Sequence, residues 1–160
     1  MVFVLLPVSF AAEVTPFVGK LKPNQSAAHE IYIKVENQEI KIDLVTIEAL
    51  PLYQTTMNLP WLEEGNFVGV KLKDVLFANG IEEFELLWIK AINDFQVTLP
   101  STTIGIDDAL LVTRFNNKIL DNSEFGPYFL VWPEEAETIK KASPESFKWI
   151  WNINRIIKVK

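Results

Sequence analysis

The segment FNNKILDNSEFGPYFLVWP, at residues 115–133, carries the clearest turn and strand signals in the chain. Two asparagines follow a strand-like end, and Gly126-Pro127 precedes an aromatic and β-branched run that stops at Pro133. Glycine and proline are turn residues, whereas aromatic and β-branched residues favour strands. The pattern therefore predicts a tight turn that leads into a buried strand at residues 128–132.

In the rest of the chain, segments with a strand-like pattern outnumber those with a helical pattern. Extended segments are predicted at residues 30–35, 40–44, 67–70, 84–91, 96–99, 109–115 and 153–159. The first two should form a hairpin with its turn at Gln38-Glu39. Pro51 interrupts a further segment at 47–53, and residues 58–65 are interpreted as a loop.

Helical signals are few. The run VKLKDVLFA at residues 70–78 has apolar residues at helical spacing, and Asn79-Gly80 supplies its C-terminal cap. Short helices are also expected near 106–108 and within 133–143. Many strands with a few short helices indicate an α+β fold with mixed sheets in a single domain.

Composition narrows the possible functions. The chain has 160 residues, is 49% hydrophobic and contains no cysteine, which excludes disulfides, thiolate chemistry and cysteine-ligated zinc or molybdenum. The net charge of −6 argues against a nucleic-acid partner, because phosphate binding needs a basic face. The single histidine, His29, is expected at the surface and cannot form a multi-histidine metal site. No catalytic or metal-ligating residue is predicted.

The N-terminus resembles an export signal. Residues 2–10 are apolar and uncharged, too short to span a bilayer as a helix, and Ser9-Phe10-Ala11 fits the small-x-small cleavage rule. A basic stretch before them is absent. We predict a signal peptide at 1–12, a mature domain at 13–160, and a periplasmic or secreted location; the alternative is a buried N-terminal strand.

Three ordered segments carry a family resemblance. They are residues 67–81 (FVGVKLKDVLFANGI), 91–100 (AINDFQVTLP) and 110–133, which includes the Gly126-Pro127 turn. In that order and spacing they resemble the molybdopterin-binding domain of the sulfite oxidase family, over residues 30–160. No single motif is specific, whereas the ordered set is.

The missing cysteine sets this chain apart from the catalytic family, in which a cysteine thiolate ligates molybdenum. Molybdenum chemistry of that kind is not expected here. The chain is more similar to small secreted members that keep the fold and bind a free, reduced pterin. That resemblance implies a periplasmic pterin-binding protein with a regulatory role. It would act through the extracytoplasmic domain of a membrane sensor that controls cyclic-di-GMP.

A pterin needs a flat apolar platform and a few convergent polar groups. Trp61 is the preferred platform, because it lies in a segment interpreted as a polar loop; the alternative is a tryptophan folded back over the core. Thr56 and Asn58, with the neighbouring Thr55, could supply hydrogen bonds from the same segment.

Four further residues are candidate ligand contacts. Asn93-Asp94 lies between two strands, so Asp94 is either a turn residue or a carboxylate that accepts two pterin N–H bonds. Arg114 could donate to the pterin O4 or pair with a surface carboxylate. Tyr128 could reach the pocket with its hydroxyl, although the Gly126-Pro127-Tyr128 turn favours a structural role. Trp132, Trp149 and Trp151 are expected in the core.

Three functions therefore stay open. The first is a secreted pterin-binding protein without catalytic activity. The second is an oxidoreductase that holds molybdopterin without the cysteine ligand. The third is an interaction module whose pocket is filled by its own side chains.

Overall fold

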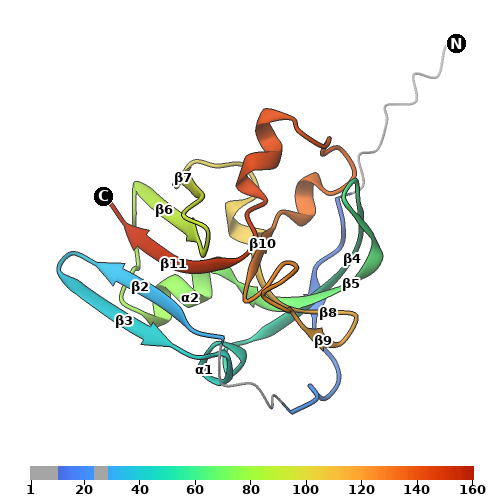
Figure 1. Cartoon of the computed structure of the whole chain (residues 1–160), viewed down its shortest axis with the longest axis horizontal. Helices are drawn as coiled ribbons and strands as arrows, with labels where there is room; N and C mark the ends of the chain where they lie inside the picture. The colour runs from blue at the N-terminus through green and yellow to red at the C-terminus, as the bar shows by residue number, and fades with distance from the viewer. Residues whose placement is uncertain (1–10, 24–28) are drawn as a thin grey trace, which may run out of the picture.

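The computed structural model describes residues 11–23 and 29–160 (Figure 1). Within them, eleven strands form a six-stranded sheet and a five-stranded sheet. The two α-helices have only five and seven residues, so the chain is mostly sheet. The expected mixed sheets with a few short helices are confirmed. The predicted signal peptide falls mainly on residues 1–10, outside the described residues.

The larger sheet has the strand order β1-β4-β5-β8-β10, with β9 paired to β8. All its pairs are antiparallel, and the long β4–β5 hairpin dominates it. Its strands are β1 (Thr15–Pro16), β4 (Leu52–Leu59), β5 (Leu62–Lys71), β8 (Leu110–Phe115), β9 (Lys118–Ile119) and β10 (Phe129–Val131). The predicted strands at 109–115 and 128–132 are therefore confirmed as β8 and β10.

The smaller sheet has the order β3-β2-β11-β6-β7. The C-terminal strand lies in its middle, parallel to β2 and antiparallel to β6. The strands are β2 (Ile31–Val35), β3 (Gln38–Ile42), β6 (Leu86–Ala91), β7 (Gln96–Pro100) and β11 (Ile153–Lys158). Because one parallel pair occurs among antiparallel ones, this sheet is mixed.

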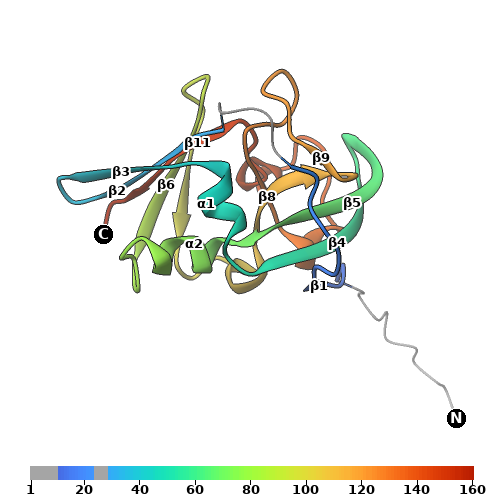
Figure 2. The same ribbon diagram turned by 90° about the horizontal axis from the view of Figure 1, so that it is seen from below.

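The helices lie between the two sheets. Figure 2 shows α1 (Leu44–Glu48) and α2 (Leu72–Ala78) in the region that separates the β2–β3 side from the β4–β5 side. Leu72, Val75 and Leu76 of α2 are buried, and Asn79 and Gly80 follow at its C-terminus with Gly80 at φ +82°. The helix predicted at 70–78 is confirmed. The other helical turns are the 3₁₀ segments η1 (Ile106–Asp108), η2 (Pro133–Glu135) and η3 (Pro144–Lys148).

The Gly126-Pro127 turn enters the core as the sequence predicts. Its peptide bond is cis, and the residues from Tyr128 to Trp132 are at most 1% exposed. A Cβ atom on Gly126 would lie 2.3 Å from the carbonyl oxygen of Leu120. Only glycine therefore fits where the turn crosses the preceding loop.

The expected loop at 58–65 is wrong. Leu59 pairs with Leu62, so these residues form the end of the β4–β5 hairpin around a turn at Pro60-Trp61. Gly65 suggested a loop, but a Cβ there would lie 2.1 Å from the ring of Phe115. The glycine makes room for an aromatic side chain inside the sheet rather than breaking the strand.

Other local expectations also need correction. Residues 44–48 form helix α1, because Asp43 accepts a hydrogen bond from the Thr46 N–H at 2.8 Å and caps its N-terminus. The β2–β3 turn lies at 36–37, where Glu36 adopts φ +54°, and not at Gln38-Glu39. His29 is only 8% exposed, and its Nε2 lies 2.8 Å from the Leu120 carbonyl oxygen. It is a core residue, not a surface one.

Within the described part of the chain, no helix has the length and apolar character needed to cross a membrane.

Candidate ligand pocket

A pocket of about 430 Å³ opens where two hairpin turns meet the segment before β11. The turn of the β4–β5 hairpin contributes Trp61, and the turn of the β6–β7 hairpin contributes Asn93 and Phe95. The remaining wall is the chain at 141–151, which includes η3. The volume lies in the range of small-molecule sites, about 300–1,000 Å³.

The walls are mainly aromatic. Besides Trp61 and Phe95, the lining includes Phe147, Trp149 and Trp151. Trp61 and Trp149 meet edge to face, with ring centroids 5.7 Å apart and an interplanar angle of 78°. Phe95, Phe147 and Trp151 are 45%, 59% and 42% exposed, so large apolar side chains remain open to solvent at the pocket.

Two indole N–H groups at the pocket have no acceptor. The Nε1 atoms of Trp61 and Trp149 are both buried and make no hydrogen bond within the described residues. A buried donor without a partner costs about 1–3 kcal/mol. Both atoms are enclosed by protein, so a ligand in the pocket would not reach them without movement of the surrounding side chains.

The other polar groups of the lining are Asn93, Lys141 and Ser146. The Asn93 Oδ1 accepts a hydrogen bond from the Phe95 N–H at 3.3 Å, so its amide NH₂ is left to donate. The Ser146 hydroxyl donates to the Ser143 carbonyl at 2.6 Å, and its oxygen can still accept. No carboxylate contributes to the lining.

The 141–151 wall is held by contacts to the Tyr128–Trp132 strand segment. The Leu130 N–H donates to the Ile150 carbonyl at 2.9 Å. The Trp132 Nε1 donates to the Lys148 carbonyl at 2.8 Å, and the Lys148 ammonium lies 4.5 Å from the Trp132 ring centroid. Lys148 also pairs with Glu135 at 2.5 Å. The turn signals at 126–133 thus position one whole side of the pocket.

The structure brings together two of the predicted site residues, Trp61 and Asn93. Thr56 lines a different, polar pocket of about 270 Å³ with Gln54, Thr55 and Asn66, among others. The Thr55 hydroxyl there is buried and has no partner within the described residues. Asn58 and Asp94 are exposed and line neither pocket.

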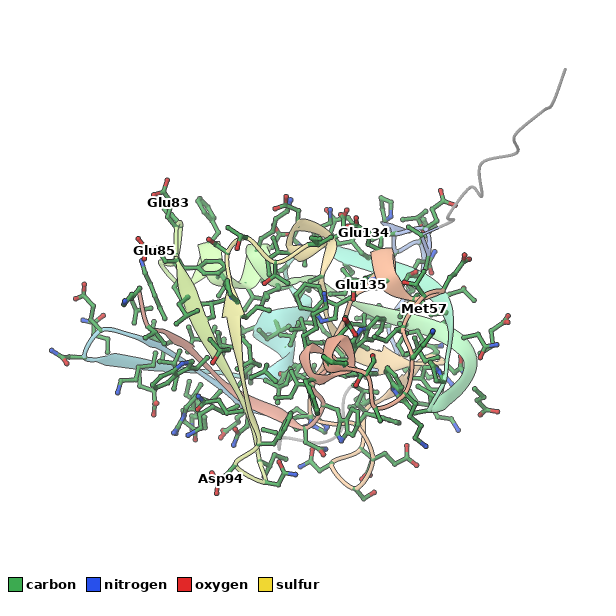
Figure 3. The ribbon with its side chains drawn as sticks, turned by 90° about the horizontal axis from the view of Figure 1, so that it is seen from above. Met57, Glu83, Glu85, Asp94, Glu134 and Glu135 are labelled. Carbon is green, nitrogen blue, oxygen red and sulfur yellow. The ribbon has the colours of Figure 1, made fainter. Side chains whose placement is uncertain are left out.

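Asp94 is a turn residue. It adopts φ +66° between β6 and β7, and Figure 3 shows it at the outer tip of that hairpin. The same figure shows Glu134 and Glu135 on a different part of the molecule.

Arg114 and Tyr128 use their polar groups inside the protein. The Arg114 guanidinium donates to both carboxylate oxygens of Glu48 at 2.8 Å and to the Lys22 carbonyl at 2.6 Å. Its partner is a buried carboxylate, not the surface one that the sequence suggested as an alternative. The Tyr128 hydroxyl donates to the His29 carbonyl at 2.9 Å, and burial raises the pKa of Tyr128. Neither residue lines the pockets that hold Trp61 or Thr56.

The sequence interpretation missed most of the 141–151 wall. Lys141, Ser146 and Phe147 were not singled out, and Trp149 and Trp151 were expected in the core. Trp149 is indeed 1% exposed and also lines the pocket, whereas Trp151 is 42% exposed, so the core expectation is wrong for Trp151. One sequence feature could have indicated this wall. Phe147, Trp149 and Trp151 are three aromatic residues in a short segment that begins at Pro144 and is not expected to form a regular helix.

Within the described residues, no group of three or more His, Cys, Asp or Glu side chains is placed to hold a metal ion.

No protein-family model and no curated protein matches the chain. Among solved structures, the chain is similar to the sulfane dehydrogenase SoxCD from Paracoccus pantotrophus, with a TM-score of 0.61 and 14% sequence identity. The match covers 99% of this chain and 50% of that one, so this chain spans half the length of its structural neighbour. At this identity the likeness shows a related fold, which agrees with the fold that the sequence resemblance implies.

Proposed function

We propose that the chain is a binding protein for a free, reduced pterin or a similar flat heteroaromatic, without catalytic activity. The observation that carries the proposal is the aromatic pocket, in which Phe95, Phe147 and Trp151 stay partly exposed beside Trp61. Sequence resemblance supports the same ligand class independently of this geometry.

The chemistry of the lining fits a pterin ring. The tryptophan and phenylalanine side chains offer apolar surface to its face. Its O4 and ring nitrogens are acceptors, and the Asn93 NH₂ can donate to them. For the pterin's own N–H groups, the Ser146 oxygen is the acceptor in place of the carboxylate expected from Asp94.

The same residues would hold the pterin part of molybdopterin, which supplies redox chemistry through its metal when bound. The chain contains no cysteine, so it cannot provide the thiolate that the catalytic family uses. The second candidate function, an oxidoreductase that holds molybdopterin without this ligand, is favoured by the structural likeness to a sulfane dehydrogenase. Metal analysis of protein purified from its native host separates the two. About one molybdenum per chain would favour the oxidoreductase.

Export and signalling complete the proposal. The apolar residues 2–10 and the Ser9-Phe10-Ala11 site support a periplasmic or secreted protein. The proposed partner is the extracytoplasmic domain of a membrane sensor that controls cyclic-di-GMP, supported by the sequence resemblance alone. Co-purification with such a sensor in the presence and absence of a pterin would test it.

Trp61→Ala should weaken pterin binding at least tenfold, equivalent to about 1.4 kcal/mol. The substitution removes the aromatic side chain that the β4–β5 turn holds at the pocket, and with it the apolar surface that would contact the ring. The measurement is quenching of tryptophan fluorescence during anaerobic titration with dihydro- and tetrahydropterins, corrected for the inner-filter effect.

Trp88→Ala is the matched control, because Trp88 is 37% exposed on β6 and does not line the pocket. It should bind like the wild type. No saturable response from the wild type would overturn the proposed function, and it would direct attention to the metal analysis and to protein partners.

A further inference from the structure

The lining of the aromatic pocket points to a more specific ligand. We propose that the ligand is an anionic heteroaromatic, whose ring enters the pocket and whose carboxylate or phosphate is bound by Lys141. This inference rests on the proposed function, because it concerns the same site. Beyond the proposed function, it specifies that the ligand is negatively charged and that Lys141 recognises this charge.

Lys141 is a cation available for a ligand. It is exposed at the pocket and makes no ion pair or hydrogen bond with any residue that the structure describes. The turn around it is constrained, since the Ser143 N–H and hydroxyl both donate to the Lys140 carbonyl, at 3.2 and 2.8 Å. Ala142 adopts φ +60° in the same turn. The direction of the Lys141 backbone is therefore set before any ligand arrives.

Neighbouring lysines differ from Lys141 in their surroundings. Lys148 already pairs with Glu135 and covers the Trp132 ring. Lys140 lines a separate pocket together with Glu135 and Glu145. Their positive charges face carboxylates, whereas the lining around Lys141 contains none.

The polar balance of the pocket favours an anion. Lys141 and the Asn93 NH₂ are donors, and no carboxylate lines the pocket. Hydrogen bonds in which the acceptor is charged are about twice as strong as neutral ones. Because Lys141 is exposed, its attraction to an anion is modest and is sensitive to salt. A ligand with an anionic substituent satisfies more of these donors than a neutral ring.

The test compares two pterins that differ at one substituent, pterin-6-carboxylate and the neutral 6-methylpterin. We expect the wild type to bind the carboxylate more tightly by up to about fivefold, the range of an exposed ion pair, and a phosphate-bearing pterin serves as the third arm to identify the preferred anion. Lys141→Met should remove this preference while leaving 6-methylpterin affinity unchanged. Raising the salt concentration should weaken only the anionic ligands.

Lys140→Met is the matched control, one residue away and outside the pocket, and it should keep the full preference. Equal affinities for charged and neutral pterins in the wild type would overturn this inference and leave the proposed function standing. So would an equal loss for both pterins in Lys141→Met, which would indicate a structural role. If no pterin binds the wild type, both the proposed function and this inference are overturned.

Discussion

Glu48→Ala is expected to lower the free energy of unfolding by about 3–5 kcal/mol. Glu48 and Arg114 form a buried ion pair whose side chains are only 10% and 3% exposed, with both carboxylate oxygens 2.8 Å from guanidinium nitrogens. Removing the carboxylate leaves the Arg114 charge buried in β8 with the Lys22 carbonyl as its remaining partner within the described residues. A buried charge without compensation is costly because water cannot reach it.

Equilibrium unfolding in urea would measure the effect. Glu39→Ala is the matched control, because Glu39 pairs with Arg155 at 3.4 Å in an arrangement whose side chains are 38% and 39% exposed. An exposed pair contributes about 0–1 kcal/mol. The double variant Glu48→Met/Arg114→Met should be less destabilised than Glu48→Ala, since it buries no lone charge. Equal losses for Glu48→Ala and Glu39→Ala would contradict the prediction.

Trp132→Ala is expected to cost about 3–5 kcal/mol of stability, in the range observed for fully buried aromatic residues. Trp132 is 0% exposed, and its removal would leave a cavity beneath η3. It would also leave the Lys148 carbonyl without the indole donor and Lys148 without its ring partner. Because this contact holds the 141–151 wall, pterin affinity should fall along with stability.

Thermal and urea unfolding would be measured beside pterin binding. Trp132→Phe retains most of the packing but loses the hydrogen bond, and should cost about 1 kcal/mol through that bond. Trp88→Ala, a tryptophan 37% exposed on β6, should cost distinctly less than Trp132→Ala. Full stability of Trp132→Ala, or lost stability with unchanged pterin affinity, would show that Trp132 does not support the pocket wall.

The elements that could be predicted are those with local causes. Helix α2 follows from apolar residues three and four apart and from Asn79-Gly80 at its end. Strand β10 follows from the Gly126-Pro127 turn and the apolar run after it. The failures also have physical causes. Gly65 suggested a loop, but a glycine is needed there because the ring of Phe115 packs against it. Phe115 lies 50 residues later in the chain, so no local pattern shows this contact.

For the candidate site, the sequence indicated Trp61 and Asn93 as ligand contacts. It did not show that they line the same pocket, or which other residues line it. Arg114 was a reasonable ligand contact because arginine is rare in this chain, with two in 160 residues. Its partner Glu48 lies 66 positions earlier, in a helix that the sequence interpretation did not recognise. Lys141 lies in a charged segment of the sequence. The local pattern there does not distinguish a lysine that lines a pocket from one that is fully solvated.

By itself, the sequence determined helix α2, strands β8 and β10 and the Gly126-Pro127 turn, and it showed that no thiolate chemistry is possible. These properties depend on backbone sterics, side-chain periodicity and composition, all of which are local. Only the tertiary structure decided that Trp61, Asn93, Lys141 and Trp149 share one pocket, and that Arg114 and Tyr128 are bonded inside the core. Those relations depend on strand order and register, which bring distant residues together through packing that no local pattern encodes.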